Sequence, residues 1–356
     1  MKFESITEQK KDLESIAESN IDFSLFRDSR VFITGATGLI GSSLVKLFLL
    51  CNKKLDLNIH VVAMVRNENK AVRCYGDLLH EKNLEIYVGD IRENISYEKP
   101  IDYIFHAASI TASKTMVNDP VGTIEIAYQG TRNMLDLAHS NKVKGFVYIS
   151  SMEVYGIPDE NLNFVKEQDL GYIDLFNVRS SYSEGKRICE CLCKAYQAEY
   201  EVPVKVARLA QTFGAGVFED DNRIYAQIAR SVIENKDIIL HSDGKSEGNY
   251  CYLKDTIEGI ILIALKGNPG EAYNVVNEKM HMEIREMADF VARNIADGKV
   301  SVKYEIPANA LSFGYAPKVK MKLSGEKLRK LGWRPQIDMK EAYEKMIQDM
   351  KLADLK

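Results

Sequence analysis

The chain lacks the features that mark secreted, membrane-bound or nucleic-acid-binding proteins. No stretch approaches the roughly 18 unbroken apolar residues of a membrane span, and residues 1–11 have mixed charge without an apolar core. Lys and Arg number 47 against 51 Asp and Glu, which gives a net charge of -4, and no long run of one charge occurs. These absences predict a cytoplasmic protein with no membrane or nucleic-acid partner.

Cysteine is also scarce, and its spacing does not suit a metal. The chain has six cysteines, three of them at alternate positions, Cys189, Cys191 and Cys193. On a helix these residues do not face one point, and no histidine or second Cys-x-x-Cys pair completes a zinc set. We therefore expect reduced, structural cysteines and no metal site.

What the sequence does contain is a glycine-rich turn between a strand and a helix. The β-branched run that starts at Val31 meets three glycines, Gly35, Gly38 and Gly41, before the apolar, helix-periodic segment 42–51. The N-terminus of such a helix points free amides and a positive dipole at the turn, which suits a pyrophosphate. Glycine allows the turn, the approach of main chain to phosphate, and close packing of helix on strand. The cofactor residues predicted in this turn are Gly35, Thr37, Gly38, Leu39, Ile40 and Gly41.

Beyond this turn, strand-like and helix-like segments alternate. The further segments that read as strands are 59–64, 84–88, 103–107, 145–150 and 204–209. The clearest long helices are 120–140 and 180–200. Short apolar runs separated by helices are typical of a parallel sheet covered on both faces. We therefore predict an α/β protein with a Rossmann-type, doubly wound parallel sheet and a smaller C-terminal substrate-binding lobe.

The sequence also suggests how the chain divides. Residues 1–30 form an N-terminal helical extension, 31–208 and 238–265 a dinucleotide-binding domain, and 209–237 and 266–356 the substrate-binding lobe. A ligand is expected in the crevice between the lobes, at the carboxyl ends of the parallel strands.

An acidic residue is missing at the point, about 20 residues past the glycines, where such folds hold the ribose hydroxyls of NAD. The second strand ends instead at Arg66, and an arginine there suits the 2′-phosphate of NADP. The cofactor is therefore NAD or NADP, with Arg66 favouring NADP. Asp90, after the third strand, is positioned to accept a hydrogen bond from the adenine amino group.

Tyr182 and Lys186 lie four residues apart on a predicted helix, so both side chains project from one face. A lysine cation and the positive ring of an oxidised nicotinamide would lower the pKa of the tyrosine from near 10. Tyr182 could then take a proton from a sugar hydroxyl as hydride leaves the same carbon. Ser151, at the end of a preceding strand, could hydrogen-bond the same oxygen.

Together these motifs resemble the extended short-chain dehydrogenase/reductases of the NAD-dependent epimerase/dehydratase family, which act on nucleotide sugars. The resemblance spans residues 31 to about 335 and is carried by TGATGLIG (34–41), GD (89–90), HAAS (106–109), SSMEVYG (150–156), Tyr182-x-x-x-Lys186, RLAQTFG (208–214) and LGW (331–333). It implies that Ser151, Tyr182 and Lys186 are catalytic and that Lys186 also bonds the nicotinamide ribose. Further cofactor residues are Ile91, Ala107, Ala108, Ser109 and Ser150.

The resemblance also assigns a role to Glu153, as a base that removes a proton from carbon 5 after oxidation at carbon 4. Met152 cannot donate a proton, which argues against a dehydratase of the glucose type. A structural role for Glu153, bonded to local backbone, is the alternative. Relatives also imply a homodimer, formed through a four-helix interface of the 120–140 and 180–200 helices.

Three positions depart from the family pattern. Ala127 and Gln211 replace usual asparagines, and Gly248 stands where relatives commonly have an arginine that grips the nucleotide diphosphate. Lys245, Arg223 or Lys318 could supply the missing cation. The predicted substrate residues are Ser151, Gln211, Lys245 and Tyr250.

Three functions remain open from the sequence. The first is an NAD(P)-dependent enzyme that oxidises a nucleotide sugar at carbon 4 and then epimerises, dehydrates or decarboxylates it. The second is an NADPH-dependent reductase of a keto sugar or another carbonyl. The third is a non-catalytic NAD(P)-binding protein, which the retained Ser151, Tyr182 and Lys186 oppose.

Overall fold

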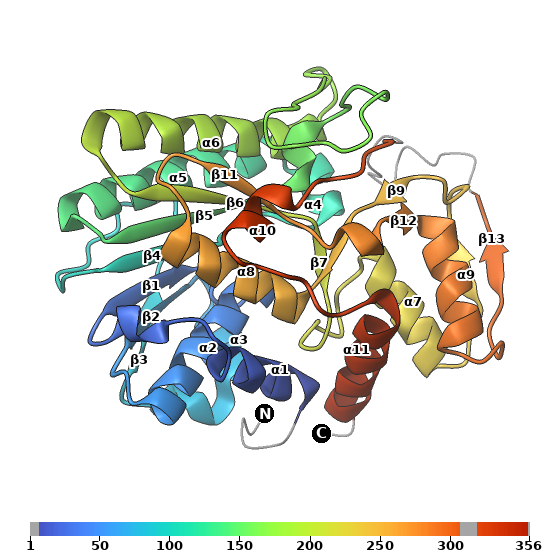
Figure 1. Ribbon diagram of the computed structural model, residues 1–356, viewed down its shortest axis with the longest axis horizontal. Coiled ribbons are helices and arrows are strands. Elements are labelled where there is room, and N and C mark those ends of the chain that lie inside the picture. The colour runs from blue at the N-terminus through green and yellow to red at the C-terminus, as the bar shows by residue number, and fades with distance from the viewer. Residues whose placement is uncertain (1–6, 307–318, 355–356) are drawn as a thin grey trace.

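A parallel sheet of seven strands forms the large lobe of the computed structural model, which describes residues 7–306 and 319–354 (Figure 1). The strand order is β11-β6-β5-β4-β1-β2-β3, and every neighbouring pair is parallel. The strands are β1 (Arg30–Thr34), β2 (His60–Val65), β3 (Leu84–Val88), β4 (Tyr103–His106), β5 (Gly145–Ser151), β6 (Val204–Leu209) and β11 (Ala272–Val275). The Rossmann-type fold predicted from the sequence is confirmed.

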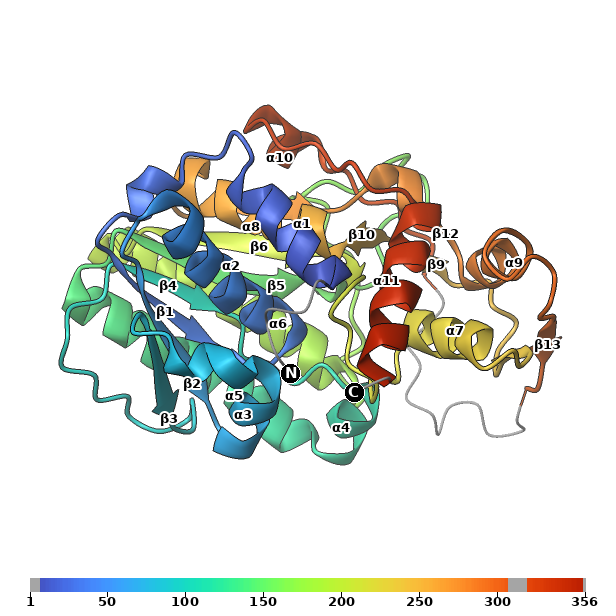
Figure 2. The ribbon, with the colours of Figure 1, turned by 90° about the horizontal axis from the view of Figure 1, so that it is seen from below.

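Helices cover both faces of this sheet (Figure 2). Alternate residues of β1 show the two faces, because Val31 and Ile33 pack in the core under α2 and α8, whereas Phe32 packs in the core under α5 and α6. The helices of the large lobe are α1 (Glu8–Ala17), α2 (Leu39–Leu55), α3 (Glu68–Tyr75), α4 (Ser113–Asn118), α5 (Pro120–Asn141), α6 (Ser180–Tyr200) and α8 (Leu253–Lys266). In the described part of the chain, no helix has the length and apolar character needed to cross a bilayer.

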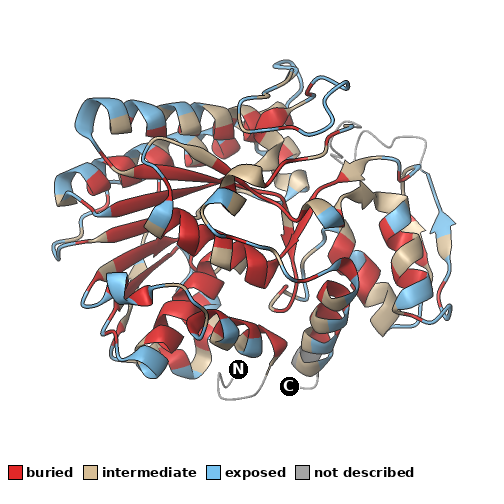
Figure 3. Cartoon of the chain, viewed as in Figure 1, coloured by how far each residue is buried: buried red, intermediate tan, exposed pale blue. Residues whose placement is uncertain are grey.

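The small lobe has its own hydrophobic core. Its helices are α7 (Ile224–Ile233), α9 (Ile284–Asn294) and α11 (Met339–Asp354). Three two-stranded sheets accompany them: β7 (Gln211–Phe213) with β10 (Tyr250–Tyr252), β9 (Glu247–Gly248) with β12 (Met282–Glu283), and β8 (Ile238–Leu240) with β13 (Val302–Tyr304). Aromatic rings fill the core, where Phe213 packs against Tyr225 and Tyr343. Figure 3 shows this buried cluster beside the continuous buried sheet of the large lobe.

Two strands differ from the division expected from the sequence. β8, expected in the dinucleotide-binding domain, pairs with β13 of the small lobe. β11, expected in the substrate lobe, pairs with β6 and forms the edge of the main sheet. Both are apolar segments of three or four residues, and nothing in such a short pattern specifies a partner far along the chain.

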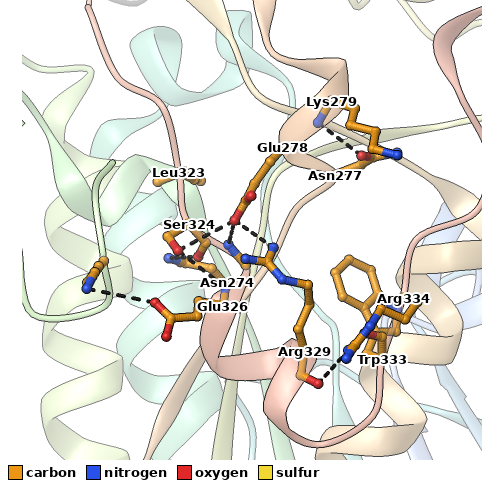
Figure 4. A network of polar contacts seen from close by, with 12 residues as sticks. Asn274, Asn277, Glu278, Lys279, Leu323, Ser324, Glu326, Arg329, Trp333 and Arg334 are labelled. Carbon is orange, nitrogen blue, oxygen red and sulfur yellow. Dashed lines mark hydrogen bonds and ion pairs between the residues drawn. The ribbon is translucent and has the colours of Figure 1, made fainter. Parts of the chain in front are cut away.

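A C-terminal segment that includes α10 (Glu326–Lys330) returns from the small lobe to the large one (Figure 1), and Figure 4 shows its polar contacts with Glu278. The indole Nε1 of Trp333 donates to the carbonyl of Asp255 at 2.8 Å. The Arg329 guanidinium pairs with Glu278 at 2.7 Å, and the Gly325 amide donates to the same carboxylate at 2.7 Å. These contacts fasten the segment to α8 and to the short helix η4 (Glu278–Met280), so the two lobes are joined at this point.

Candidate active site

The turn from β1 to α2 leaves no room for a side chain at two of its glycines. Gly35 has φ +62°, and a Cβ there would lie 2.7 Å from the Ala107 carbonyl that follows β4. A Cβ on Gly41 would lie 2.3 Å from the Gly35 oxygen. Gly38 is the N-cap of α2 and gives it no side-chain hydrogen bond. The first amides of α2 are therefore available to an anion, and the turn fits the pyrophosphate of a dinucleotide.

A buried hydrogen-bond chain holds the end of β4 beside this turn. His106 Nδ1 lies 2.7 Å from Thr34 Oγ1, and its Nε2 lies 3.1 Å from Thr131 Oγ1. Thr34 Oγ1 also accepts from the Ala108 amide at 3.1 Å. Burial lowers the pKa of His106 to about 3, so the ring is neutral and serves structure. The predicted cofactor residues 107–109 follow directly and are partly exposed.

The ends of β2 and β3, which would contact the adenosine half of a dinucleotide cofactor, carry side chains of opposite charge. Arg66 is exposed at the end of β2. Asp90 follows β3, and its carboxylate accepts from Arg92 Nε at 3.0 Å and from Arg92 Nη2 at 2.7 Å. These bonds, with smaller help from Arg66, lower the pKa of Asp90 to about 2. Asp90 is therefore an ionised acceptor already engaged by Arg92, a residue that the sequence reasoning missed.

Two predicted cofactor residues turn their side chains into the protein. Ile91 is buried against Gly130, where a Cβ would lie 2.9 Å from the Ile91 side chain. The Ser150 hydroxyl is buried and donates to Glu190 at 2.5 Å. Glu190 in turn pairs with Arg208 at 2.7 Å. Packing uses both side chains inside the fold, so any contact of these two predicted residues with a cofactor would have to come from the backbone.

Lys186 lies in a buried position at the end of β5. Its ammonium donates to the Ile149 carbonyl at 2.8 Å and lies 5.8 Å from the centre of the Tyr182 ring. Burial lowers the pKa of Lys186 to about 8. Its charge also acts on His106, so the lysine lies near the hydrogen-bond chain that adjoins the glycine turn. The structure thus brings Tyr182 and Lys186 close to the proposed cofactor site.

Burial and nearby charges set the acidity of Tyr182. Burial, together with the negative charge of Glu153, raises the pKa of Tyr182 to about 12, although a hydrogen bond with Ser151 lowers it. The expectation that Lys186 and an oxidised nicotinamide together make this phenol more acidic concerns the protein with its cofactor bound, and it stays a prediction.

Arginines supply the positive charge that favours the phenolate of Tyr182. Arg179, just before α6, is buried and bonds both oxygens of Glu153, with its Nη1 2.6 Å from Oε2 and its Nη2 2.9 Å from Oε1. The Ser183 hydroxyl adds a third bond to Glu153 at 3.3 Å. Arg179 was missed from the sequence, although it stands three residues before the tyrosine. The role of Glu153 as a carbon-5 base stays a prediction. To take a proton, Glu153 would have to break one of its bonds to Arg179 and so free a carboxylate oxygen.

The small lobe contributes Arg223, the N-cap residue of α7. Its Nε donates to Asp221 at 3.0 Å, its side chain is 43% exposed, and its charge favours the phenolate of Tyr182. Arg223, considered from the sequence as a substitute for the missing arginine, therefore lies on the side of the small lobe that faces the reacting phenol.

The other predicted substrate residues have unequal access to a ligand. Gln211 is partly exposed and Lys245 is exposed. Tyr250 is 0% exposed, and its buried hydroxyl has no hydrogen-bond partner among the described residues. A Cβ on Gly248 would lie 2.3 Å from this hydroxyl, so the Tyr250 ring fills the space beside the glycine. The prediction that Tyr250 touches substrate was wrong for this conformation. Lys318 lies outside the described residues.

These features define a class of protein. A Rossmann sheet whose glycine turn adjoins a serine at the end of β5 and a tyrosine and a lysine on α6 is the architecture of dinucleotide-dependent short-chain dehydrogenase/reductases. Comparison of the sequence with known families is consistent with this, because the NAD dependent epimerase/dehydratase family matches residues 31–276. The chain belongs to this family, whose enzymes use NAD and modify nucleotide sugars by epimerisation, dehydration or decarboxylation.

Individual relatives agree with the family assignment. UDP-glucuronic acid decarboxylase 1 of Danio rerio is 27% identical over 321 residues, covering 90% of this chain and 72% of that protein. Among solved structures, an epimerase from Methanothermobacter thermautotrophicus superposes with a TM-score of 0.79 at 20% identity, covering 96% of each chain. UDP-glucuronic acid 4-epimerase from Bacillus cereus, in complex with UDP-glucuronic acid and NAD, gives a TM-score of 0.74 at 20% identity, covering 91% of this chain and 99% of that one. The two structures share the fold.

Proposed function

We propose that this protein oxidises a nucleotide sugar at carbon 4, alters the resulting keto sugar by epimerisation, dehydration or decarboxylation, and then reduces it again. The observation that supports this most directly is the convergence of Ser151, Tyr182 and Lys186 at the end of β5, beside the glycine turn. NAD bound at that turn would supply the hydride acceptor and a positive ring near the phenol. No external reductant is consumed in such a cycle.

The chain's own residues divide the work of the first step. Tyr182 takes the proton of the carbon-4 hydroxyl, and Ser151 hydrogen-bonds the same oxygen. Since burial holds the Tyr182 pKa high, the charges of Arg179 and Arg223 help to stabilise the phenolate. Lys186, whose buried ammonium lies 5.8 Å from the centre of the Tyr182 ring, would bond the nicotinamide ribose.

A nucleotide hexuronate is the first substrate to test. The sequence relatives named as UDP-glucuronic acid decarboxylases match about nine-tenths of this chain. The partly exposed guanidinium of Arg223 also suits an anionic group near the reacting carbon. Carbon-4 oxidation of a hexuronate gives a β-keto acid, which loses carbon dioxide readily.

The test is turnover of UDP-glucuronic acid by the purified protein without added reductant, followed by mass spectrometry of the sugar nucleotide. Tyr182→Phe should lower the rate by about 100-fold to 10,000-fold, the usual contribution of a general base, while NAD binding is retained. Tyr200→Phe, on the same helix but 43% exposed, is the matched control and should leave turnover unchanged. Full activity of Tyr182→Phe would refute the role.

A reductase is the second candidate, and Arg66 is the observation that favours it. Its exposed guanidinium at the end of β2 suits the 2′-phosphate of NADP. Denaturing the purified protein and identifying any nucleotide released separates the two functions. NAD+ supports the closed cycle, whereas NADP+, or steady consumption of added NADPH, supports the reductase.

We also propose a homodimer formed through α5 and α6. Three apolar side chains on one face of α5 are exposed: Val121 by 66%, Ile124 by 46% and Tyr128 by 38%. Ile188 on the neighbouring α6 is exposed by 46%. Pairing of two such faces would remove these side chains from water. Light scattering should give twice the monomer mass for the wild type and a monomer for Ile124→Glu.

A further inference from the structure

Helix α1 precedes the family match at residues 31–276 and lies between the two lobes. It packs on α2 and α8 of the large lobe and on α11 of the small lobe, as Figure 2 shows. Its apolar side, with Leu13 and Ile16, is buried in the core of the large lobe. Its other buried residues are polar, and they form an unusual set of contacts.

Gln9 joins three helices through one residue. Its Nε2 donates to Ser43 Oγ at 3.3 Å, and its Oε1 accepts from Lys46 Nζ at 2.9 Å, both on α2. Its backbone amide donates to Asp349 on α11 at 3.3 Å. Gln9 is only 8% exposed, and burial lowers the pKa of Lys46, so these bonds form largely away from water. Buried polar groups are costly to leave unpaired, which makes this arrangement specific.

The same residue packs against a turn of the small lobe. A Cβ on Gly216, whose φ is +93°, would lie 2.0 Å from Gln9 Nε2. The Gly216 amide donates to the second oxygen of Asp349 at 2.8 Å. This turn follows β7, which begins at Gln211, and leads to Arg223 at the start of α7. Gln9 therefore supports the segment that carries two candidate substrate residues.

Asp12, one turn further along α1, holds the strand next to β7. Its carboxylate accepts from the Tyr252 hydroxyl at 2.5 Å and from Lys345 Nζ at 2.7 Å. Tyr252 ends β10, which pairs with β7. Both strands of this small sheet are thus anchored, directly or through the following turn, to α1.

The network also reaches the cofactor turn. Ser43 Oγ, which accepts from Gln9, donates to the carbonyl of Leu39 at 2.7 Å. Leu39 is the first residue of α2, directly after Gly38. An uninterrupted path of contacts therefore joins the first turn of the cofactor helix to residues 211–223.

We propose that Gln9 is a positioning residue, which sets the 211–223 segment of the small lobe relative to the cofactor turn so that a nucleotide sugar can bind. The proposal rests on the proposed function for the identity of the ligand. The cofactor turn keeps its own backbone bonds without Gln9, whereas the 214–217 turn loses the side-chain amide that packs against Gly216 and that Ser43 and Lys46 hold in place. Loss of Gln9 therefore weakens substrate binding more than cofactor binding.

The experiment uses the full-length Gln9→Met protein, since methionine matches the length of glutamine without its polar atoms. UDP, measured by calorimetry with saturating NAD+, is the binding probe, and hydrogen exchange reports on the 211–223 amides. We expect the Kd for UDP to rise about tenfold, the Kd for NAD+ to change less than about twofold, and exchange in 211–223 to accelerate. Ser15→Ala, exposed on the same helix, should match the wild type in all three measurements.

The outcomes separate this proposal from a purely structural role and from failure of the proposed function. A lower melting temperature with unchanged UDP affinity and unchanged exchange in 211–223 overturns it. If the wild type itself does not bind UDP, the proposed ligand is wrong, and the exchange measurement alone then decides for or against Gln9. Should Gln9→Met not fold, Lys46→Met removes one of the same bonds from the α2 side and is judged by the same measurements.

Discussion

The cofactor end and the substrate end of the candidate site are built in different ways. The cofactor end is a continuous stretch, 34–41, in which Gly35 and Gly41 are enclosed by backbone atoms. The substrate end is assembled from separate segments, with Gln211 on β7 and Arg223 before α7, and its sheets pair across long stretches of chain. One end depends on backbone shape and the other on packing between lobes.

This difference has a consequence for substitution. An enclosed backbone turn tolerates no added atom, because neither side of the contact can move without moving a strand or a helix. A packed substrate end tolerates exchanges of side chains, and its ligand preference can change with them. Substitutions at the two ends should therefore have very different effects.

The largest effect is expected for Gly41→Ala at the cofactor end. Its Cβ would lie 2.3 Å from the Gly35 oxygen, so α2 must shift away from β1 and its first amides leave their positions. We expect NAD+ affinity to fall by at least about 100-fold, a loss of about 3 kcal/mol. Gly298→Ala is the control, since a Cβ there meets no described atom within 4 Å. This variant should lose only the stability that the strain of its positive φ costs, and its NAD+ affinity should match the wild type. Equal NAD+ affinities in the two variants would contradict the steric argument.

The second prediction concerns Asp255, at the junction of the lobes. Burial raises its pKa to about 7. In the part of the chain that the structure describes, one carboxylate oxygen has no hydrogen-bond partner, while the other accepts from the Gln336 and Ile337 amides. A folded-state pKa above the unfolded value means that the folded state binds more protons between about pH 4 and 7, so this group costs stability as pH rises.

Asp255→Asn should remove this cost while leaving an oxygen for the two amides. We expect the free energy of unfolding of the variant, relative to wild type, to rise by about 2 kcal/mol between pH 5 and 7.5, measured by urea denaturation. Parallel stability curves across this range would show that Asp255 is not protonated in the folded protein.

The parts of the site that the sequence predicted are those built from residues close together in the chain. The glycine turn and the Tyr182–Lys186 pair each lie within a few residues of one another, so local spacing was enough to find them. The Arg179–Glu153 pair spans 26 positions, and the burial of Tyr250 depends on rings from β7 and α11. Such contacts leave no periodic signal in a single sequence. The same limit explains why β8 and β11 were expected in the wrong lobes.

A smaller effect is expected for Arg179, which pairs with Glu153 beside the reacting phenol. Arg179→Met leaves the charge of Glu153 unopposed and removes a cation that favours the Tyr182 phenolate, so the pKa of Tyr182 rises further. The acidic limb of the kcat/KM profile should move to higher pH by about one unit, with about a tenfold loss near neutral pH. Arg179→Lys keeps the positive charge, so its acidic limb should lie close to that of the wild type. A limb that does not move in the methionine variant would remove Arg179 from the mechanism.

The smallest effect is expected for Tyr250→Phe at the substrate end. The Tyr250 hydroxyl is buried without a partner in residues 7–306 and 319–354, so removing it relieves a desolvation cost. The free energy of unfolding should stay the same or increase by up to about 1 kcal/mol. KM for the sugar nucleotide should not change, since no part of the ring is exposed.

Gly248→Ala is the informative companion, because its Cβ would lie 2.3 Å from the hydroxyl oxygen of Tyr250 and 2.4 Å from the ring carbon that bears it. That variant should lose about 1–3 kcal/mol, and adding Tyr250→Phe should recover only part of the loss, because the ring contact remains. A raised KM in Tyr250→Phe would instead mean that the ring swings out to meet the substrate, and that the space beside Gly248 opens during binding.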